Sequence, residues 1–397
     1  MRSLRNTLGA LLAASVVAPA VAAAGLSDAF ENPRFAHLGL APLAPALADT
    51  VASTYPVASA SSSIGFVYNR ALDVVVRRPG VLGPIVGERA DTVGPGQFAL
   101  DVGYSYVQLA TINGDRLDDL VNAPPVLRRR VLFFPVPDGI ELRDGRRTTL
   151  LPVRVGLDVD VTAHIVATSL TYGVTSDLDL NLTMPLLRTA LAVRTRTRVP
   201  DPRLLPFALP PGSPEAGVVG QADSDASEGV GDLLLRAKYV LRRGSPVDLA
   251  AGLGLSLPSG QADDFQGTGT TRVQPLLIAS RRLGHRLELL ANAGADVNAD
   301  DVDRTVLRWA IGGTVSIVEP VAGAVVFLGR HELARQTARI AFPFFFQIER
   351  NEIYDASVGL RWRITEAAVL SANALMPLNR DGLRADAIPT IEVEYAF

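Results

Sequence analysis

Apolar and polar residues alternate with a period of two along most of the chain. From residue 98 to 106 the even positions are Phe98, Leu100, Val102, Tyr104 and Tyr106, and the odd positions between them are small or acidic. Successive side chains of a β-strand point to opposite faces, whereas a helix would group apolar residues every three or four positions. The same alternation recurs at 178–186, 233–241, 247–255 and 354–362. The pattern therefore predicts β-strands with one apolar and one polar face.

About twelve segments of this kind follow one another along the chain. Their predicted bounds are 97–109, 155–172, 176–188, 230–242, 246–258, 271–282, 286–297, 305–317, 321–332, 353–364, 368–378 and 389–397. Most of them reach the length of roughly ten residues that a tilted strand needs to cross a bilayer. Strands of soluble sheets are usually shorter, at about five or six residues. Strand length therefore favours a membrane-spanning sheet over a soluble sandwich.

The connections between these strands alternate in length. Long connections follow the odd-numbered strands, the two longest at 110–154 and 189–229, so all tight turns lie at one end of the sheet. The tight turns are predicted at 173–175, 243–245, 283–285, 318–320 and 365–367. An even strand number with short turns at one end and long loops at the other is typical of bacterial outer-membrane barrels. We predict an all-β fold, an antiparallel transmembrane β-barrel with short periplasmic turns and long external loops.

Residues 1–24 have the organisation of a secretory signal peptide. Arg2 and Arg5 precede an apolar run from Leu8 to Val17, which is too short to cross a bilayer as a helix. Small residues then crowd 18–25 and fit the cleavage pattern of such peptides. The chain is therefore expected to be exported, and together with the barrel pattern this predicts a location in the bacterial outer membrane.

Residues 25–95 differ from the barrel that we expect over 96–397. They are rich in Ala, Pro and Ser through Ser63 and then offer one plausible hairpin, with Phe66 and Tyr68 facing Val74 and Val76. Three arrangements fit this segment: a plug inside the lumen, a periplasmic extension, or two further strands that would make the barrel fourteen-stranded.

Composition narrows the class of protein further. The chain has no cysteine, which excludes disulfides, thiolate metal sites and a lipoprotein anchor. Its mean hydropathy is +0.23 although 20% of its residues are charged, so its apolar residues are spread over strand faces. The net charge of −3 gives no sign of a nucleic-acid partner. We also expect no cofactor and no metal, because zinc motifs, phosphate-binding glycine loops and calcium-loop spacing are absent from the sequence.

The carboxyl terminus ends on an alternating aromatic strand. Ile391, Val393, Tyr395 and Phe397 alternate with polar or small residues. This segment resembles the terminal strand that outer-membrane proteins present to the barrel assembly machinery, with Tyr395 and Phe397 as the assembly signal. That machinery is therefore an expected partner.

Several hairpin segments resemble one known family. They are 229–232 (GVGD) leading into the strand 233–241, then 253–260 (LGLSLPSG), 267–269 (GTG) and 172–185 (YGVTSDLDLNLTMP). These segments are similar to the core pattern of the outer-membrane transporters named for the MetA-pathway of phenol degradation, over roughly residues 95–397. The resemblance implies a barrel that passes small hydrophobic or aromatic compounds.

Charged residues recur on the strand faces that we expect to point inward. The candidates for lining a pore are Asp158, Asp160, His164, Arg236, Lys238, Arg272, Arg308, Arg361 and Arg363. Mixed charges line water-filled lumens, and they equally pair with one another to stabilise any barrel interior.

We therefore predict a passive outer-membrane channel for small hydrophobic or aromatic solutes, surrounded by outer-membrane lipid, with lipopolysaccharide contacting its external arginines. The alternative is a structural or surface-interaction barrel with a blocked pore. A barrel hydrolase would have to use His164, which shares a predicted face with Asp160 and Thr162. Because the sequence has no Gly-x-Ser-x-Gly nucleophile motif, we expect no enzyme.

Overall fold

The computed structural model describes most of the chain from Gly25 onward. The residues that it describes are 25–31, 43–54, 66–69, 74–77, 82, 86–121, 132–141, 145–198, 218–244, 246–333, 338–340, 346–348 and 352–397. The predicted signal peptide, residues 1–24, lies outside them. Within the described residues, no helix is long and apolar enough to cross a bilayer.

Twelve antiparallel strands close into one barrel, as predicted. They are β3 (Phe98–Ile112), β7 (Arg147–Gly173), β8 (Leu178–Arg198), β10 (Leu233–Arg242), β11 (Asp248–Leu257), β12 (Arg272–Leu283), β13 (Leu287–Asn298), β14 (Val306–Val318), β15 (Val321–Glu332), β18 (Glu352–Arg363), β19 (Ala368–Pro377) and β21 (Ile388–Ala396). Each strand pairs with its neighbours along the chain, and the pairings of β8 with β10 and of β21 with β3 complete the ring. Closure leaves no strand edge to be satisfied in lipid.

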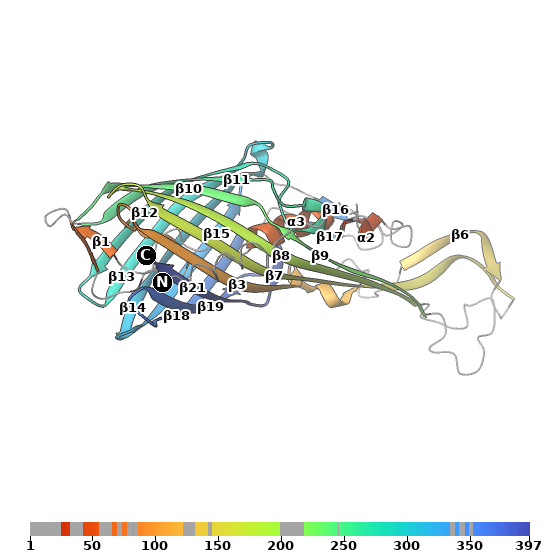
Figure 1. Cartoon of the computed structure of the whole chain (residues 1–397). Coiled ribbons are helices and arrows are strands. Elements are labelled where there is room, and N and C mark those ends of the chain that lie inside the picture. The colour runs from red at the N-terminus through yellow and green to blue at the C-terminus, as the bar shows by residue number, and fades with distance from the viewer. Residues whose placement is uncertain are drawn as a thin grey trace, which may run out of the picture.

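Tight turns and long connections lie at opposite ends of the barrel, again as predicted. The long hairpin of β7 and β8, with β6 (Leu132–Glu141) and β9 (Val218–Val230) paired to it, projects far beyond the other barrel strands in Figure 1. The two longest connections were predicted as loops, and that was wrong over much of their length, because β7 and β8 extend through them and pair with added strands. The elements in the long connections are β4 (Asp115–Arg116), η2 (Leu117–Asp119), β5 (Leu120–Val121), β6 (Leu132–Glu141), β9 (Val218–Val230), η4 (Ala262–Asp264), η5 (Val302–Arg304), β16 (Ala338–Ile340), β17 (Phe346–Ile348) and β20 (Leu383–Ala385).

The outer surface carries a continuous apolar belt. Every one of the twelve barrel strands contributes at least one large apolar side chain that is more than a third exposed. One example from each strand, in chain order, is Tyr104, Leu170, Leu182, Leu235, Leu253, Leu277, Leu289, Ile311, Phe327, Leu360, Met376 and Ile391. Exposed apolar patches of this extent are rare on soluble monomers, and they match the lipid-facing band of membrane barrels.

The segment before β3 contributes two helices and one separate hairpin. The helices are α2 (Asp28–Glu31) and α3 (Leu43–Thr54), and the hairpin pairs β1 (Phe66–Asn69) with β2 (Val74–Arg77). This hairpin forms a two-stranded sheet of its own, so it does not enter the barrel wall. The fourteen-stranded alternative is therefore wrong.

Helix α3 belongs to an apolar cluster at the long-loop end of the barrel. Its residues Leu43, Leu47 and Val51 are fully buried together with inner-face residues of β7 and β8 such as Val161 and Leu191. Burial of such side chains stabilises by about 1.5–3 kcal/mol each. The helix is thus held inside the wall by packing.

Candidate functional site

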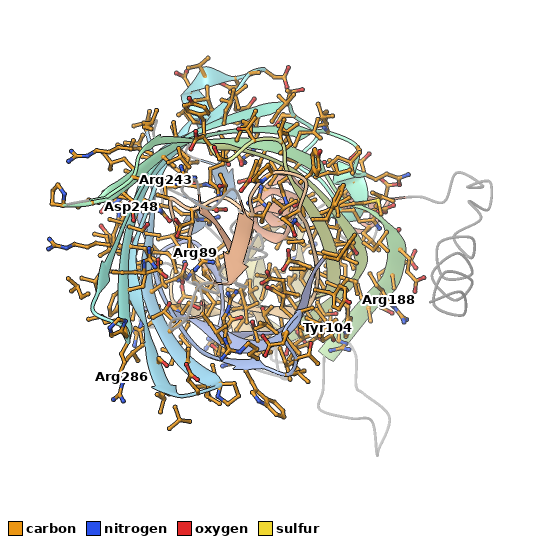
Figure 2. All side chains as sticks on the ribbon, turned by 60° about the vertical axis from the view of Figure 1, so that its left-hand side comes forward. Arg89, Tyr104, Arg188, Arg243, Asp248 and Arg286 are labelled. Atoms are coloured by element: carbon orange, nitrogen blue, oxygen red, sulfur yellow. The ribbon has the colours of Figure 1, made fainter. Side chains whose placement is uncertain are left out.

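The lumen holds an extended stretch of chain, residues 86–94, against its inner wall. The backbone N–H of Glu88 donates to Asn292 Oδ1 at 2.7 Å, and Asn292 Nδ2 donates back to the Glu88 carbonyl at 2.8 Å. Further along, the N–H of Ala90 donates to Ser280 Oγ at 3.1 Å and that of Val93 to Asp179 at 3.1 Å. Figure 2 looks into the barrel and shows Arg89 inside the ring of strands. Inward-facing polar side chains of β8, β12 and β13 therefore supply the hydrogen bonds that this buried backbone needs.

A cavity of about 270 Å³ lies beside this stretch of chain. Its apolar wall includes Leu234, Leu276, Ile278, Leu328, Leu375 and Ile388. Its charged wall includes Glu88, Arg236, Lys238, Arg308, Arg330, Asp355 and Arg384. An apolar pocket with a few converging polar groups is the usual form of a small-molecule site.

The charged residues of the lumen form a series of ion pairs. Arg236 Nη1 lies 3.2 Å from Glu88 Oε1, and Lys238 Nζ lies 3.7 Å from Asp179 Oδ2. Both cations had been predicted to line the pore, and the structure places them on the inner face. Their carboxylate partners come from residues 86–94 and from β8, so each ion pair joins separate segments of the chain inside the lumen.

Two more of the predicted residues, Arg272 and Arg308, share one carboxylate. Asp296 pairs with Arg308 and lies 3.6 Å from Arg272 Nη1, while Arg272 also pairs with Asp49 of α3. Helix α3 is therefore joined to the barrel wall by charge as well as by apolar packing.

Arg361 lies among three buried carboxylates. Its Nη2 is 3.7 Å from Glu392 Oε1, and the carboxylate oxygens of Asp101, Glu392 and Glu394 lie within 4.8 Å of one another. Such a group of oxygens has ligands that a hard cation could use, but a guanidinium already supplies positive charge there. Arg363 follows on the same strand face, near the short turns.

The predicted placement of Asp158, Asp160 and His164 on the inner face is wrong. They alternate with the buried inner residues of β7 and share the outer face with exposed Leu170 and Tyr172. On that face Asp158 pairs with Arg194 at 3.3 Å, and Gln108 Nε2 donates to Asp160 at 3.3 Å. These three residues are not pore-lining.

The physical reason is an inversion of polarity along β7 and β8. Near the short turns the inner residues are polar, such as Ser169 and Asn181, and the outer ones are apolar. Toward the long loops the inner residues become apolar, as at Val159 and Val193, because they pack around α3. The outer residues there become polar. A period of two is preserved throughout, so alternation alone cannot reveal the exchange of faces.

His164 lies on the outer face of β7, at the boundary between the apolar and the polar outer residues. Its Nδ1 lies 2.8 Å from the Tyr104 hydroxyl, and its ring centroid is 5.1 Å from that of Tyr106. Arg188 opposite it on β8 points away from the barrel in Figure 2. Amphipathic rings at the edge of an apolar belt are typical of the membrane–water interface. The hydrolase hypothesis required His164 and Asp160 to face the lumen, but both face outward.

Four lumen residues that the sequence did not single out complete the site: Glu88, Asn292, Arg330 and Arg384. Glu88 lies in the segment of undecided role, and Arg384 lies in a connection that was expected to be external. Asn292 and Arg330 had a sequence signal, since each lies at an inward-facing position of a predicted strand, 286–297 and 321–332 respectively.

A closed antiparallel barrel with an apolar outer belt and a charged lumen has the architecture of membrane-spanning β-barrels. The family model described as MetA-pathway of phenol degradation matches residues 142–326, which confirms the resemblance found in the hairpin segments. No curated protein sequence matches the chain significantly.

Several solved structures are similar at low identity. An outer membrane channel from Pseudomonas putida F1 is 14% identical, with 78% of this chain and 98% of that chain covered and a TM-score of 0.45. A Pseudomonas aeruginosa FadL homologue is 10% identical, with 76% and 90% covered and a TM-score of 0.35. The Pseudomonas putida toluene transporter TodX is 10% identical, with 77% and 90% covered and a TM-score of 0.34.

Proposed function

We propose that the protein is a passive channel of the bacterial outer membrane for small hydrophobic or aromatic solutes. The observation that carries this proposal is the cavity of about 270 Å³ inside the closed barrel, with Leu276, Ile278 and Leu328 on its apolar wall. A barrel interior filled only for stability would pack such side chains against one another. The matched family, named for phenol degradation, agrees with an aromatic solute.

Three features support the proposed location. The apolar belt suits a bilayer, the short turns gather at one end as in bacterial barrels, and β21 carries the expected assembly signal at Tyr395, next to Phe397. We infer that the barrel assembly machinery recognises this strand. We infer that Arg188 and Arg194, which are exposed above the belt, contact lipopolysaccharide phosphates.

Residues 86–94 and α3 both lie inside the barrel, against its inner wall. We infer that this N-terminal segment acts as a partial plug, and that solutes move past it through the cavity or when it shifts. Conductance for simple ions is therefore expected to be small even if aromatic solutes pass.

The test compares two adjacent residues of β12. Leu276 lines the cavity, whereas Leu277 points to the lipid side and is 53% exposed. Leu276→Trp fills the cavity, so uptake of a radiolabelled phenol by intact cells is expected to fall toward that of cells lacking the protein. Leu277→Trp adds the same ring to the lipid face and is expected to leave uptake unchanged.

The alternative is a blocked barrel that acts through its surface, which the buried packing of α3 favours. On that hypothesis neither tryptophan variant changes uptake, and cells with and without the protein take up phenol equally. That result, with the barrel correctly folded, would overturn the channel proposal.

A further inference from the structure

We propose that Gln274 is the specificity-determining residue of the channel, and that its side-chain amide hydrogen-bonds to a hydroxyl group on a neutral, otherwise apolar solute. The inference rests on the proposed function and names the substrate class of the same cavity. Gln274 lies on β12, two positions before Leu276 on the same inner face, and both residues line the cavity.

Gln274 lies where two cavities of the lumen adjoin. The cavity of about 270 Å³ and a smaller one of about 40 Å³ share three lining residues, Leu234, Gln274 and Arg308. We call these three residues the neck. The smaller cavity lies toward the long loops, because Asp232 and, from α3, Ala52 also line it. On the route from the long-loop end to the larger cavity, a solute therefore passes the side chain of Gln274.

The amide of Gln274 has no hydrogen-bond partner within the part of the chain that the structure describes. The other amide side chains on the inner faces of the described barrel strands each have one. Asn181 donates to Ser169, Asn292 to the Glu88 carbonyl, Asn298 to Thr270 and Asn373 to Ser357. An amide presents N–H donors and a carbonyl acceptor, so Gln274 can both donate to and accept from a molecule in the neck.

Gly254 makes room for this amide beside Arg236. It is the cross-strand partner of Arg236 on β10 and of Gln274 on β12. A Cβ at residue 254 would lie 3.1 Å from Gln274 Oε1 and 3.6 Å from Arg236 Cγ. The guanidinium of Arg236 donates instead to Asn181 and Glu88. The glutamine amide therefore lies over the glycine and is left facing the neck.

The surroundings of the amide favour a neutral solute with an apolar body. Leu234 lies in the neck, and Leu276 continues the apolar wall into the larger cavity. The positive charge of Arg308 is compensated by its ion pair with Asp296. Burying an apolar body against this wall is favourable, whereas burying an ion without a charged partner is costly. A hydroxyl group both donates and accepts, as the amide does, so it is the neutral group that suits Gln274 best.

The experiment compares the uptake of radiolabelled phenol and of radiolabelled toluene by intact cells, each corrected for cells that lack the protein. In toluene a methyl group replaces the hydroxyl at nearly the same size, so the ratio of the two uptakes isolates the hydrogen bond. Gln274→Met keeps the length of the side chain and removes the amide. We expect it to lower the phenol-to-toluene ratio roughly three- to tenfold, as one neutral hydrogen bond contributes. Gln108→Met, the same substitution at an exposed glutamine on the outer face of β3, is the matched control and should keep the parent ratio.

Competition on the unaltered protein gives a second readout that needs no variant. Unlabelled phenol should inhibit the uptake of labelled phenol at a concentration roughly three- to tenfold lower than unlabelled toluene does. Equal inhibition by the two compounds overturns the inference. This measurement decides alone if Gln274→Met fails to fold.

An unchanged phenol-to-toluene ratio in folded Gln274→Met also overturns the inference. So does an equal fall in both uptakes, because a merely steric role of the side chain would affect the two solutes alike, and so does an equal change of the ratio in Gln108→Met. The fate of the channel proposal is distinguishable from these outcomes. If Leu276→Trp abolishes phenol uptake while the ratio does not respond to Gln274→Met, the channel stands and only the role of Gln274 falls. If cells with and without the protein take up both solutes equally, the channel proposal itself falls.

Discussion

Asp232 accepts two hydrogen bonds from Thr268, one from the backbone N–H at 2.8 Å and one from the hydroxyl at 2.8 Å. The other carboxylate oxygen accepts from the N–H of Gly260 at 3.1 Å. Asp232 is only 3% exposed. The three residues come from the segments 229–232, 253–260 and 267–269 that carry the family resemblance. Hydrogen bonds between these short motifs therefore form one joint, a fixed contact between two neighbouring long connections.

Replacing Asp232 with alanine should break this joint. The part-buried N–H groups of Gly260 and Thr268 would lose their acceptor, and leaving a buried donor unsatisfied costs about 1–3 kcal/mol. We expect the free energy of unfolding, measured by urea titration in lipid vesicles, to fall by at least that amount. Asp225→Ala removes an exposed carboxylate from the nearby strand β9 and is the control. Equal stability of the two variants would contradict the role of Asp232.

On the outer face, Gly329 makes room for Trp309. A Cβ at residue 329 would overlap the indole ring, which also donates from Nε1 to His331 Nε2 at 3.1 Å. Gly329→Ala should push the ring out of this place and destabilise the barrel by about 1–3 kcal/mol, as overpacking does. Tryptophan fluorescence in a Trp362→Phe background reports the displacement.

The control for this substitution lies on the same strand and the same face. A Cβ at Gly323 would meet the flexible end of Ile317 at 3.3 Å. Gly323→Ala should therefore leave both stability and emission close to those of the parent. A larger effect at Gly323 than at Gly329 would be inconsistent with the packing described.

Neutralising Asp49 should loosen α3. Asp49→Asn keeps the size of the side chain and removes the charge that pairs with Arg272, a contribution of about 1.5–3 kcal/mol for a charged hydrogen bond. The population of barrels with a displaced helix should rise roughly tenfold or more. Planar-bilayer recordings should then show more frequent or larger openings. Asp28→Asn, at an exposed position of α2, should not change the recordings, and identical traces for both variants would contradict the role of the Asp49–Arg272 ion pair.

The polarity inversion predicts where lipid ends on β8. The chain has no cysteine, so single cysteines can be introduced without background labelling. A spin label at Leu182, Met184 or Leu186 should be accessible to oxygen dissolved in lipid. A label at Arg188 or Arg194, on the same outer face, should be accessible to a water-soluble nickel reagent instead. Lipid exposure that continued to position 194 would refute the boundary.

Much of the barrel was predictable from local sequence. The twelve strands, their approximate bounds and the short turns at one end follow from alternation and turn residues, which depend only on neighbours along the chain. The loops around β6 and β9 were the exception. Their strands form because β7 and β8 continue past the belt and offer them backbone partners, a condition that no local pattern reports.

The site was only partly predictable. Arg236, Lys238, Arg272, Arg308 and Arg361 lie on the inner face, as their alternation indicated. The same rule placed His164, Asp158 and Asp160 on the wrong face. Alternation defines two faces of a strand without saying which face meets lipid. Beyond the apolar belt, the polar residues of β7 and β8 lie on the outer face instead of the inner one. The opposition of Arg308 and Arg330, and the approach of Asp49 and Arg384, depend on register and on chain packed into the lumen. Local alternation is thus enough to predict the twelve barrel strands and the order in which they pair. Which polar groups meet inside the lumen depends on the folded barrel, because those contacts join residues far apart along the chain.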